Sequence, residues 1–427
     1  MSDKRDALLR ARFGIDGRLL DIGREADGEL ADVFAQIGDI ASYNQIKVLS
    51  AMGRCGLGSG HFVTSTGYGY GDAGRDVLEE IYAEVFGTEA ALVRPQIISG
   101  THAIATAMFG VLRPGDELLS VTGAPYDTLL KVIGVQEARG SLIEHGIMYK
   151  EAPLAADGMP DTAAIRALIG PKTKMAAIQR SKGYTLRRSY TVDEINELIA
   201  FIKGINPDIV CFVDNCYGEF TDYFEPVADL LAGSLIKNPG GGLAPVGGYI
   251  AGKSELVHAA ACRLNTPGIG RDIGPSLGLS SVFAQGLFNA PQAVKGALMG
   301  AVFAARIFEK LNIDHAPRAL EKRSDIVQAA VLKTPEALQA FCQGIQKASP
   351  VDAFVMPEPG AMPGYACPVI MASGAFVQGS SIELSADAPL RPPYAVFFQG
   401  GLSYDHSRTG VLMGVNELIK LQPSYLP

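Results

Sequence analysis

An aspartate and a lysine of this 427-residue chain each end a short apolar run, where they could act on the same small molecule. Asp214 closes the apolar run 210–213, and in open α/β sheets ligands bind at the carboxyl ends of the strands. A carboxylate there can hold the nitrogen of a pyridinium ring in its protonated form, so that the ring acts as an electron sink. A helix N-cap or a loop carboxylate is the competing interpretation, and it is the commoner one for an isolated aspartate.

Lys237 lies in the segment SLIKNPGGG, residues 234–242, which begins as an expected strand at 234–236 and continues as a glycine-rich turn. A deprotonated lysine amine can form a Schiff base with a carbonyl compound. Consecutive glycines favour a backbone that approaches a ligand closely, whereas a lysine at the end of a strand is more often simply solvated. The separation from Asp214 leaves room for one crossover between neighbouring strands.

Two further segments carry polar or aromatic side chains at turns. Ser99, Gly100 and Thr101 open a helical stretch, where unpaired backbone N–H groups bind phosphate. Ser99 or Thr101 would serve equally well as a plain N-cap, and the two interpretations are compatible. Tyr126 follows a strand and a proline turn, so its ring could lie flat on a heterocycle, although loop aromatics are more often packing residues.

Apolar strands alternate with helical stretches from about residue 75 to residue 290, which is typical of a doubly wound, mostly parallel α/β sheet. Thr191 followed by Glu194 is a capping-box pattern that predicts a helix start. Strands are expected at 90–93, 117–121, 175–179, 208–213, 234–236, 248–250, 368–371, 381–384 and 394–398. Helices are expected at 101–112, 127–135, 293–311, 335–347 and 407–421.

These expectations divide the chain into three parts. Residues 1–74 form an N-terminal helical arm and a glycine-rich loop, residues 75–290 a large α/β domain, and residues 291–427 a smaller C-terminal α+β domain.

The composition is that of an acidic globular protein, with 48% hydrophobic residues, a net charge of -8 and a pI near 5.4. No cluster of Lys and Arg would serve a nucleic acid or an acidic membrane. We expect a cytoplasmic protein, because no apolar stretch is long enough to cross a membrane and the N-terminus carries no signal region. Six scattered cysteines without a Cys-x-x-Cys pair predict neither a disulfide framework nor a metal site.

Taken in order, these segments resemble the fold-type I enzymes that depend on pyridoxal 5'-phosphate (PLP). Within that class the chain is similar to the Cys/Met-metabolism group, which includes cystathionine lyases, methionine gamma-lyase and cystathionine gamma-synthase. The segments GYGYGDAGRD, SLIKNPGGG and RPPY resemble one branch closely, the methionine gamma-lyase-like or "aluminium resistance" proteins. The resemblance extends from about Gly67 to Thr409.

The resemblance implies a role for each of the residues above. Lys237 would carry PLP as a Schiff base and move the proton of the substrate Cα. Asp214 would pair with the pyridine nitrogen, and Tyr126 would stack on the ring and assist the leaving group. The residues that would hold the phosphate are Ser99, Gly100, Thr101 and Ser234.

The same resemblance implies a homo-oligomer with shared active sites, either a dimer or a tetramer of two dimers. Tyr68 and Tyr70 would reach the phosphate of the neighbouring subunit. Arg391 would clamp the substrate carboxylate, because a guanidinium fork binds a carboxylate through two hydrogen bonds. The better-known lyases have Tyr-x-Arg at 68–70 and a hydroxyl residue in place of Ile236, so these departures leave the substrate and the reaction branch open.

The expected function is a PLP-dependent carbon–sulfur lyase that acts on an amino acid of the methionine, cystathionine or cysteine type by β- or γ-elimination. One alternative is a γ-replacement transferase of the cystathionine gamma-synthase type. Another is a non-catalytic metal-tolerance or PLP-binding protein. A dinucleotide-binding oxidoreductase is disfavoured, because the Gly-x-Gly-x-x-Gly match at 69–74 follows a poor strand.

Overall fold

A computed structural model describes residues 2–362 and 365–426, which belong to two compact units. The large unit comprises residues 44–289, and the small unit comprises residues 1–43 together with 290–427. Helices α3 (Ala31–Arg54) and α10 (Ser280–Lys310) each contain a boundary between the two units. The division into an arm, a large domain and a small domain stays a prediction.

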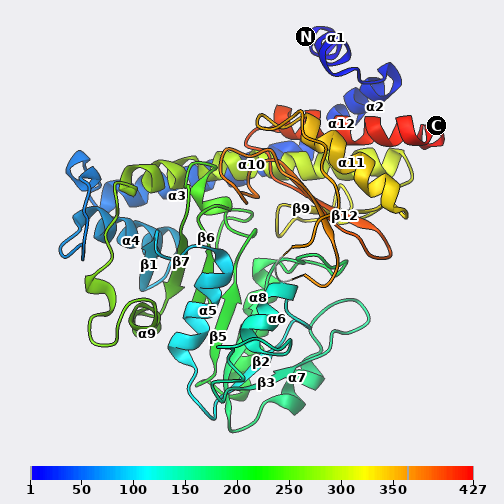
Figure 1. The fold of residues 1–427 in the computed structure, drawn as a ribbon. Helices are drawn as coiled ribbons and strands as arrows, with labels where there is room; N and C mark the ends of the chain where they lie inside the picture. Colours follow the sequence, from blue (N-terminus) through cyan, green and yellow to red (C-terminus); the bar gives the residue numbers. More distant parts are fainter. Residues whose placement is uncertain (1, 363–364, 427) are drawn as a thin grey trace. The chain divides into compact units, whose positions relative to one another are not determined.

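A seven-stranded, mostly parallel sheet forms the centre of the large unit, in the order β1-β7-β6-β5-β4-β2-β3 (Figure 1). Strand β7 is antiparallel to both of its neighbours, and the remaining pairs are parallel. The strands are β1 (Ala90–Arg94), β2 (Glu117–Ser120), β3 (Met148–Glu151), β4 (Thr173–Gln179), β5 (Val210–Asp214), β6 (Leu230–Ser234) and β7 (Gly248–Gly252).

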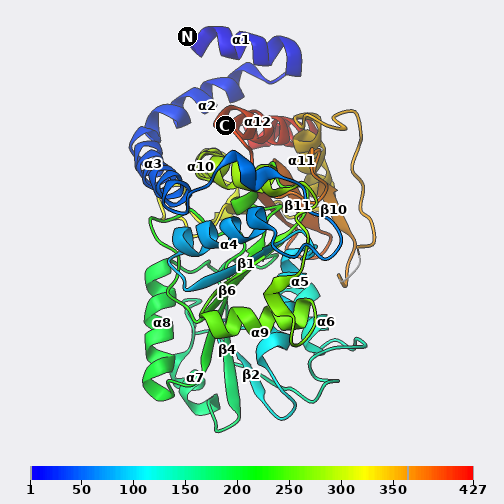
Figure 2. The same ribbon diagram turned by 90° about the vertical axis from the view of Figure 1, so that its left-hand side faces the viewer.

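Helices cover both faces of this sheet, as the doubly wound pattern predicts. Figure 2 shows α7 and α8 on one side of the sheet and α5, α6 and α9 on the other. All five residues of β1, β5, β6 and β7 are buried, because a sheet covered on both faces exposes neither side of its central strands. The helices are α4 (Ala73–Phe86), α5 (Gly100–Val111), α6 (Asp127–Ile133), α7 (Thr162–Leu168), α8 (Val192–Ile205) and α9 (Ser254–Leu264), with short 3-10 helices η1 (Ser59–Phe62), η2 (Asn238–Gly240) and η3 (Gly270–Asp272).

The small unit contains an antiparallel sheet in the order β10-β11-β12-β9-β8. Its strands are β8 (Asp314–Ala316), β9 (Val327–Val331), β10 (Val369–Ala372), β11 (Ser385–Pro389) and β12 (Ala395–Gln399). Its helices are α1 (Ser2–Phe13), α2 (Gly17–Glu29), α11 (Pro335–Lys347) and α12 (Tyr404–Leu421), with η4 (Pro423–Tyr425) at the end. The fold class predicted from the sequence is confirmed.

Two expected strands are wrong in position. The run 234–236 is not a strand, since β6 occupies Leu230–Ser234 and the chain turns directly after it. The run 381–384 precedes β11 instead of forming it. In both places, buried apolar side chains stand in a turn next to a strand, and hydrophobicity alone does not distinguish the two. Helix α10 begins at Ser280, well before the expected residue 293, and Pro291 lies inside it.

The capping box at the start of α8 is confirmed. Thr191 Oγ1 accepts a hydrogen bond from the Glu194 N–H at 3.2 Å, and Glu194 Oε2 accepts one from the Thr191 N–H at 2.8 Å.

Replacing Thr191 with alanine is expected to lower the free energy of unfolding by about 1 kcal/mol, measured by denaturant titration. The control is Thr162→Ala in α7, where Asp161 supplies the cap and the expected change is much smaller. Equal effects of both substitutions would contradict the assignment.

No helix within residues 2–362 and 365–426 is long and apolar enough to cross a membrane.

Candidate active site

The carboxyl ends of several strands of the large unit lie at one edge of its sheet. Strands β5 and β6 are parallel, and β1 is antiparallel to β7, which is itself antiparallel to β6. Strand β1 therefore runs in the same direction as β5 and β6. Helix α5, which follows β1, consequently begins at the edge where Asp214 ends β5 and Ser234 ends β6.

Gly100, the first residue of α5, lies where these segments meet. A Cβ atom at Gly100 would be 3.1 Å from Cys216 Sγ, 3.4 Å from Ser234 Cβ and 3.8 Å from Lys237 Nζ. The structure thus brings the first turn of α5 together with the lysine and the serine that the sequence singled out. A larger side chain at position 100 would fill the space between them.

Tyr126 lies beside the same turn and is held through both its backbone and its hydroxyl group. Thr101 Oγ1 is 3.0 Å from Tyr126 Oη, and either hydroxyl can donate. The Tyr126 N–H donates to Gln179 Oε1 at 3.1 Å. Burial raises the pKa of Tyr126 far above its usual value, so the phenol keeps its proton at neutral pH. Ser99 is the N-cap of α5 and accepts a hydrogen bond from the His102 N–H at 3.1 Å.

Asp214 is buried at the end of β5, and its residue is only 6% exposed. Its Oδ1 accepts a hydrogen bond from the Cys216 N–H at 3.1 Å. Burial raises the pKa of Asp214, and the positive charge of Lys237 and the hydrogen bond from Cys216 oppose that rise. An ionised carboxylate at this place therefore gains from a positively charged partner.

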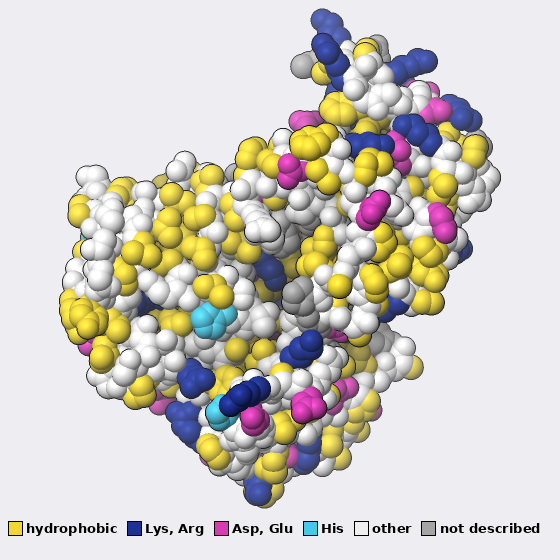
Figure 3. Space-filling view, in the orientation of Figure 1, with side chains coloured by type: hydrophobic (Ala, Val, Ile, Leu, Met, Phe, Trp, Pro, Cys, Tyr) yellow, Lys and Arg dark blue, Asp and Glu magenta, His cyan; other side chains and the backbone are white. Residues whose placement is uncertain are grey.

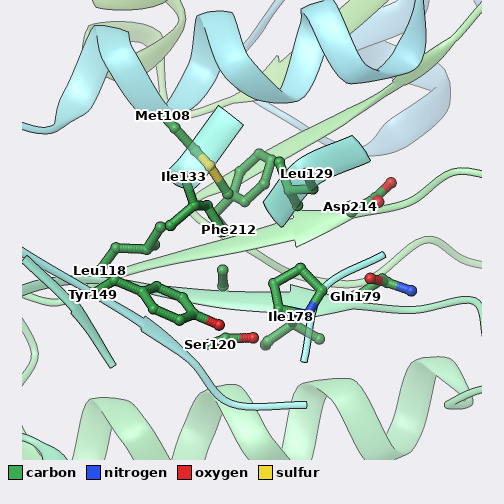
Figure 4. A pocket seen from close by; sticks show the side chains of 12 residues that line it. Met108, Leu118, Ser120, Leu129, Ile133, Tyr149, Ile178, Gln179, Phe212 and Asp214 are labelled. Carbon is green, nitrogen blue, oxygen red and sulfur yellow. The ribbon is translucent and has the colours of Figure 1, made fainter. Parts of the chain in front are cut away.

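Figure 4 shows a small cavity that Asp214 and Gln179 border and that apolar side chains line, among them Leu118, Ile133 and Phe212. Its volume is about 10 Å³, enough for roughly one water molecule. At this volume the cavity is too small for an organic ligand.

Lys237 follows β6 and precedes η2. Its Nζ is 3.9 Å from the centroid of the Tyr217 ring. Burial disfavours the charged amine, but Cys216, Tyr217 and Asp214 favour it and together outweigh burial. The pKa of the free Lys237 amine therefore lies well above its usual value.

The turn after Lys237 requires glycine. A Cβ atom at Gly240 would lie 1.7 Å from the carbonyl oxygen of Leu235, and Gly241 has a φ of 56°. Gly240 and Gly241 are therefore needed where the backbone folds back on itself. The contact between these glycines and a ligand, expected from the sequence, stays a prediction.

Sequence reasoning missed a buried polar network next to Asp214. Arg180 is fully buried and donates from Nη1 to Asn215 Oδ1 at 2.7 Å and to Glu225 Oε2 at 3.1 Å. Asn215 Nδ2 donates to the same Glu225 oxygen at 2.9 Å, and the Arg180 N–H donates to the Asp214 carbonyl at 3.1 Å. The signal for this network in the sequence was an arginine directly after an apolar strand. An arginine buried at such a place needs polar partners, because arginine is almost never fully buried without them.

A second part of this network reaches the residue after Lys237. Glu219 Oε1 accepts a hydrogen bond from Tyr249 Oη at 2.8 Å, and the Glu219 carbonyl accepts one from Asn238 Nδ2 at 2.9 Å. Burial raises the pKa of Glu219 to about 8, so this carboxyl is mostly protonated at neutral pH.

Three predicted site residues lie apart from these contacts or in the other unit. Tyr68 and Tyr70 are 70% and 66% exposed, and the Gly274 N–H donates to the Tyr68 carbonyl at 2.9 Å. Arg391 belongs to the small unit, whereas Lys237 belongs to the large unit. The phosphate contacts predicted for the two tyrosines and the carboxylate clamp predicted for Arg391 stay predictions.

On the face seen in Figure 3, Lys and Arg side chains are interspersed with Asp and Glu side chains. In the part of the chain that the structure describes, no group of three or more His, Cys, Asp and Glu side chains is arranged to hold a metal ion.

The fold and this geometry agree with the similarities of the chain to known proteins. The protein YnbB of Bacillus subtilis (strain 168) is 52% identical over 403 residues, which cover 93% of this chain and 96% of YnbB. A carbon-sulfur lyase involved in aluminum resistance from Clostridium novyi NT is 46% identical, with a TM-score of 0.92 over 96% of this chain and 98% of that one.

A protein from Clostridium acetobutylicum, provisionally described as a cystathionine beta-lyase involved in aluminum resistance, is 44% identical. Its structure matches with a TM-score of 0.95 over 98% of this chain and 100% of its own. The pyridoxal-5'-phosphate dependent protein YhfS from Escherichia coli is 17% identical with a TM-score of 0.60, a likeness of fold alone. The family model of methionine gamma-lyase matches residues 19–419, and the chain belongs to the methionine gamma-lyase family.

Proposed function

We propose that this protein is a PLP-dependent carbon–sulfur lyase that acts on a sulfur-containing amino acid. The observation that carries the proposal is the meeting of Lys237 Nζ with the first turn of α5 and with Ser234 at the edge where Asp214 ends β5. The family and a PLP-dependent structural neighbour imply PLP, and relatives described as carbon-sulfur lyases support the reaction class.

The residues at this edge fit the phosphate of PLP. Ser234 is 1% exposed, and its Oγ makes no hydrogen bond to any of the described residues. A buried hydroxyl without a partner is costly, and a phosphate oxygen would satisfy it. The N-terminus of α5 supplies backbone N–H groups and a positive dipole end, while the missing side chain of Gly100 leaves room for the group.

Asp214 and Lys237 fit the two reactive ends of the cofactor. Asp214 would pair through its carboxylate with the protonated ring nitrogen, which would offset the cost of its burial. Lys237 would hold the cofactor covalently through Nζ. PLP would supply the electron sink for the charge left when the substrate loses its Cα proton.

The side chains around this site would then move the protons of the reaction. Lys237, once released, would take the proton from the substrate Cα onto Nζ. Tyr126 keeps its proton at neutral pH, so its hydroxyl could donate that proton to the departing sulfur as the carbon–sulfur bond breaks. The thiol would leave with the proton, and the proton taken up by Lys237 would restore the Tyr126 hydroxyl. Hydrolysis of the released product by water would then give an α-keto acid and ammonia. Arg391 would hold the substrate carboxylate, and Tyr68 and Tyr70 would complete a neighbouring site in a homo-oligomer.

The proposal is tested with the purified protein and PLP. We expect a yellow complex that absorbs as a protonated imine and releases α-keto acid from at least one of methionine, cystathionine, homocysteine and cysteine. A product in which a second nucleophile has replaced the sulfur group, formed without keto-acid release, would instead indicate the γ-replacement transferase. A colourless protein that takes up no PLP would overturn the proposal.

Replacing Ser234 with alanine is expected to weaken PLP binding by roughly tenfold or more, because one hydrogen bond to a charged phosphate is lost. The melting temperature of the cofactor-free protein should stay the same or rise, because the unpartnered hydroxyl disappears. Ser385→Ala is the matched control, since Ser385 is 3% exposed and its Oγ is likewise without a partner among the described residues. An effect on PLP affinity at both positions, or at neither, would argue against a phosphate contact by Ser234.

A further inference from the structure

The ring of Tyr217 lies against the Lys237 amine, and the proposed function gives it no role. Lys237 Nζ lies 3.9 Å from the centroid of the Tyr217 ring. The face of an aromatic ring attracts an ammonium group within about 6 Å of its centroid. Tyr217 comes three residues after Asp214, so one turn supplies both the carboxylate and the ring.

The backbone of Tyr217 is in a conformation that bulky residues avoid. Its φ is 71°, in the left-handed region, and Phe220 in the same turn has a φ of 63°. A residue other than glycine keeps such a conformation only where the surrounding structure enforces it, and such residues cluster at functional sites. Glycine or asparagine would adopt this conformation more easily. The tyrosine at this position therefore indicates that its aromatic ring has a function there.

The surrounding hydrogen bonds enforce this turn. The Gly218 N–H donates to the Asn215 carbonyl at 3.0 Å, and Asn215 is itself held between Arg180 and Glu225. A Cβ atom at Gly218 would lie 2.4 Å from Arg180 Cδ, so the buried arginine packs directly against the turn. The polar network thus holds the backbone that aims the Tyr217 ring at Lys237.

We propose that Tyr217 is a positioning residue for Lys237, whose amine the ring face holds in its charged form and in its place between Gly100 and Ser234. The proposal rests on the proposed function, in which Lys237 binds PLP and moves a proton. The competing interpretation is a ring that only fills space in the turn. The two differ in whether loss of the ring changes the proton affinity of Lys237.

Four other titratable groups act on Lys237 and stay unchanged in the test. They are Asp214, Cys216 and Tyr126 around the amine, and Glu219 further along the turn. These side chains are the same in the wild type and in every variant, so a difference between the variants reports on the ring of Tyr217. Removing the ring should lower the pKa of Lys237 by about one unit, because the 3.9 Å cation–π contact is lost.

The test uses the full chain with three substitutions. Tyr217→Phe keeps the ring face and the backbone strain. Tyr217→Leu keeps the strain and an apolar side chain but has no ring face. Tyr217→Asn also lacks the ring and tolerates the left-handed backbone, so it replaces the leucine variant if that one folds poorly.

Two readouts other than turnover report on Lys237. One is the pH dependence of the rate at which the cofactor-free protein forms its imine with PLP, which needs the neutral amine. The other is the pH at which the bound imine loses its proton and the colour changes. We expect both to move by about one unit to lower pH in the Leu and Asn variants and to stay at the wild-type value in the Phe variant.

Coincident profiles of the wild type and the Leu and Asn variants would overturn the proposal, since the ring would then only fill space. An equal shift in the Phe variant would also overturn it, because the hydroxyl and not the ring face would act. A wild-type protein that takes up no PLP would overturn the proposed function together with this inference, whereas unshifted variants of a yellow protein overturn the inference alone.

Discussion

Replacing Lys237 with alanine is expected to abolish the yellow colour of the PLP complex and to lower keto-acid release by at least about 1,000-fold. The substitution removes the amine that holds the cofactor and, in the same step, the base that takes the proton from the substrate. The absorption spectrum after removal of free PLP measures the first loss, and a keto-acid assay measures the second. Lys237→Arg should behave in the same way, because a guanidinium keeps the charge but does not form the imine.

Lys174→Ala is the control for this experiment. Lys174 is an exposed lysine in β4 of the same sheet, and its loss should leave colour and activity unchanged. A Lys237→Ala protein that keeps a covalently bound cofactor would show that another lysine is the attachment site.

Replacing Asp214 with asparagine is expected to lower keto-acid release by about 100-fold or more, because the charge that would keep the ring nitrogen protonated is lost. Asparagine has nearly the same shape, and its Oδ1 can still accept the hydrogen bond from the Cys216 N–H. Little loss of activity would show that the carboxylate is only structural.

The same substitution should change how the stability of the cofactor-free protein depends on pH: the stability of the asparagine variant relative to the wild type should rise with pH. Burial raises the pKa of Asp214 in the folded state. The stability linked to this group is therefore complete below the pKa of the unfolded chain, near 3.9, and is lost as the pH rises through the higher folded-state pKa. The asparagine variant has no such loss. Melting temperatures of both proteins from pH 4 to pH 8 measure the difference, and a variant whose relative stability falls with rising pH would contradict the assignment.

Local patterns in the sequence were sufficient for many elements. Helix α11 begins and ends where its periodicity predicted, and the Thr191–Glu194 pattern marks the start of α8. Strands β1 and β5 were found within a few residues, because fully buried strands are continuous apolar runs. Strand β4 was also found within a few residues, although Lys174 in it is exposed. The three missed boundaries, at 234–236, at 381–384 and at the start of α10, are places where the burial of a turn or the tolerance of a proline depends on distant parts of the chain.

The candidate site divides in the same way. The sequence by itself determined that Asp214 ends a strand and that Ser99, Gly100 and Thr101 open a helix, because apolar runs and small-residue turns are local signals. It placed Lys237 directly after a strand, whereas two residues of a turn separate Lys237 from β6. Only the tertiary structure decided that Gly100, Ser234 and Lys237 lie close together, since strand order and direction place the ends of β1, β5 and β6 at one edge. It also decided that Arg180 and Glu225 are buried partners and that the Tyr217 ring faces Lys237. Burial and pairing arise from contacts between residues far apart in the chain, and no local pattern encodes them.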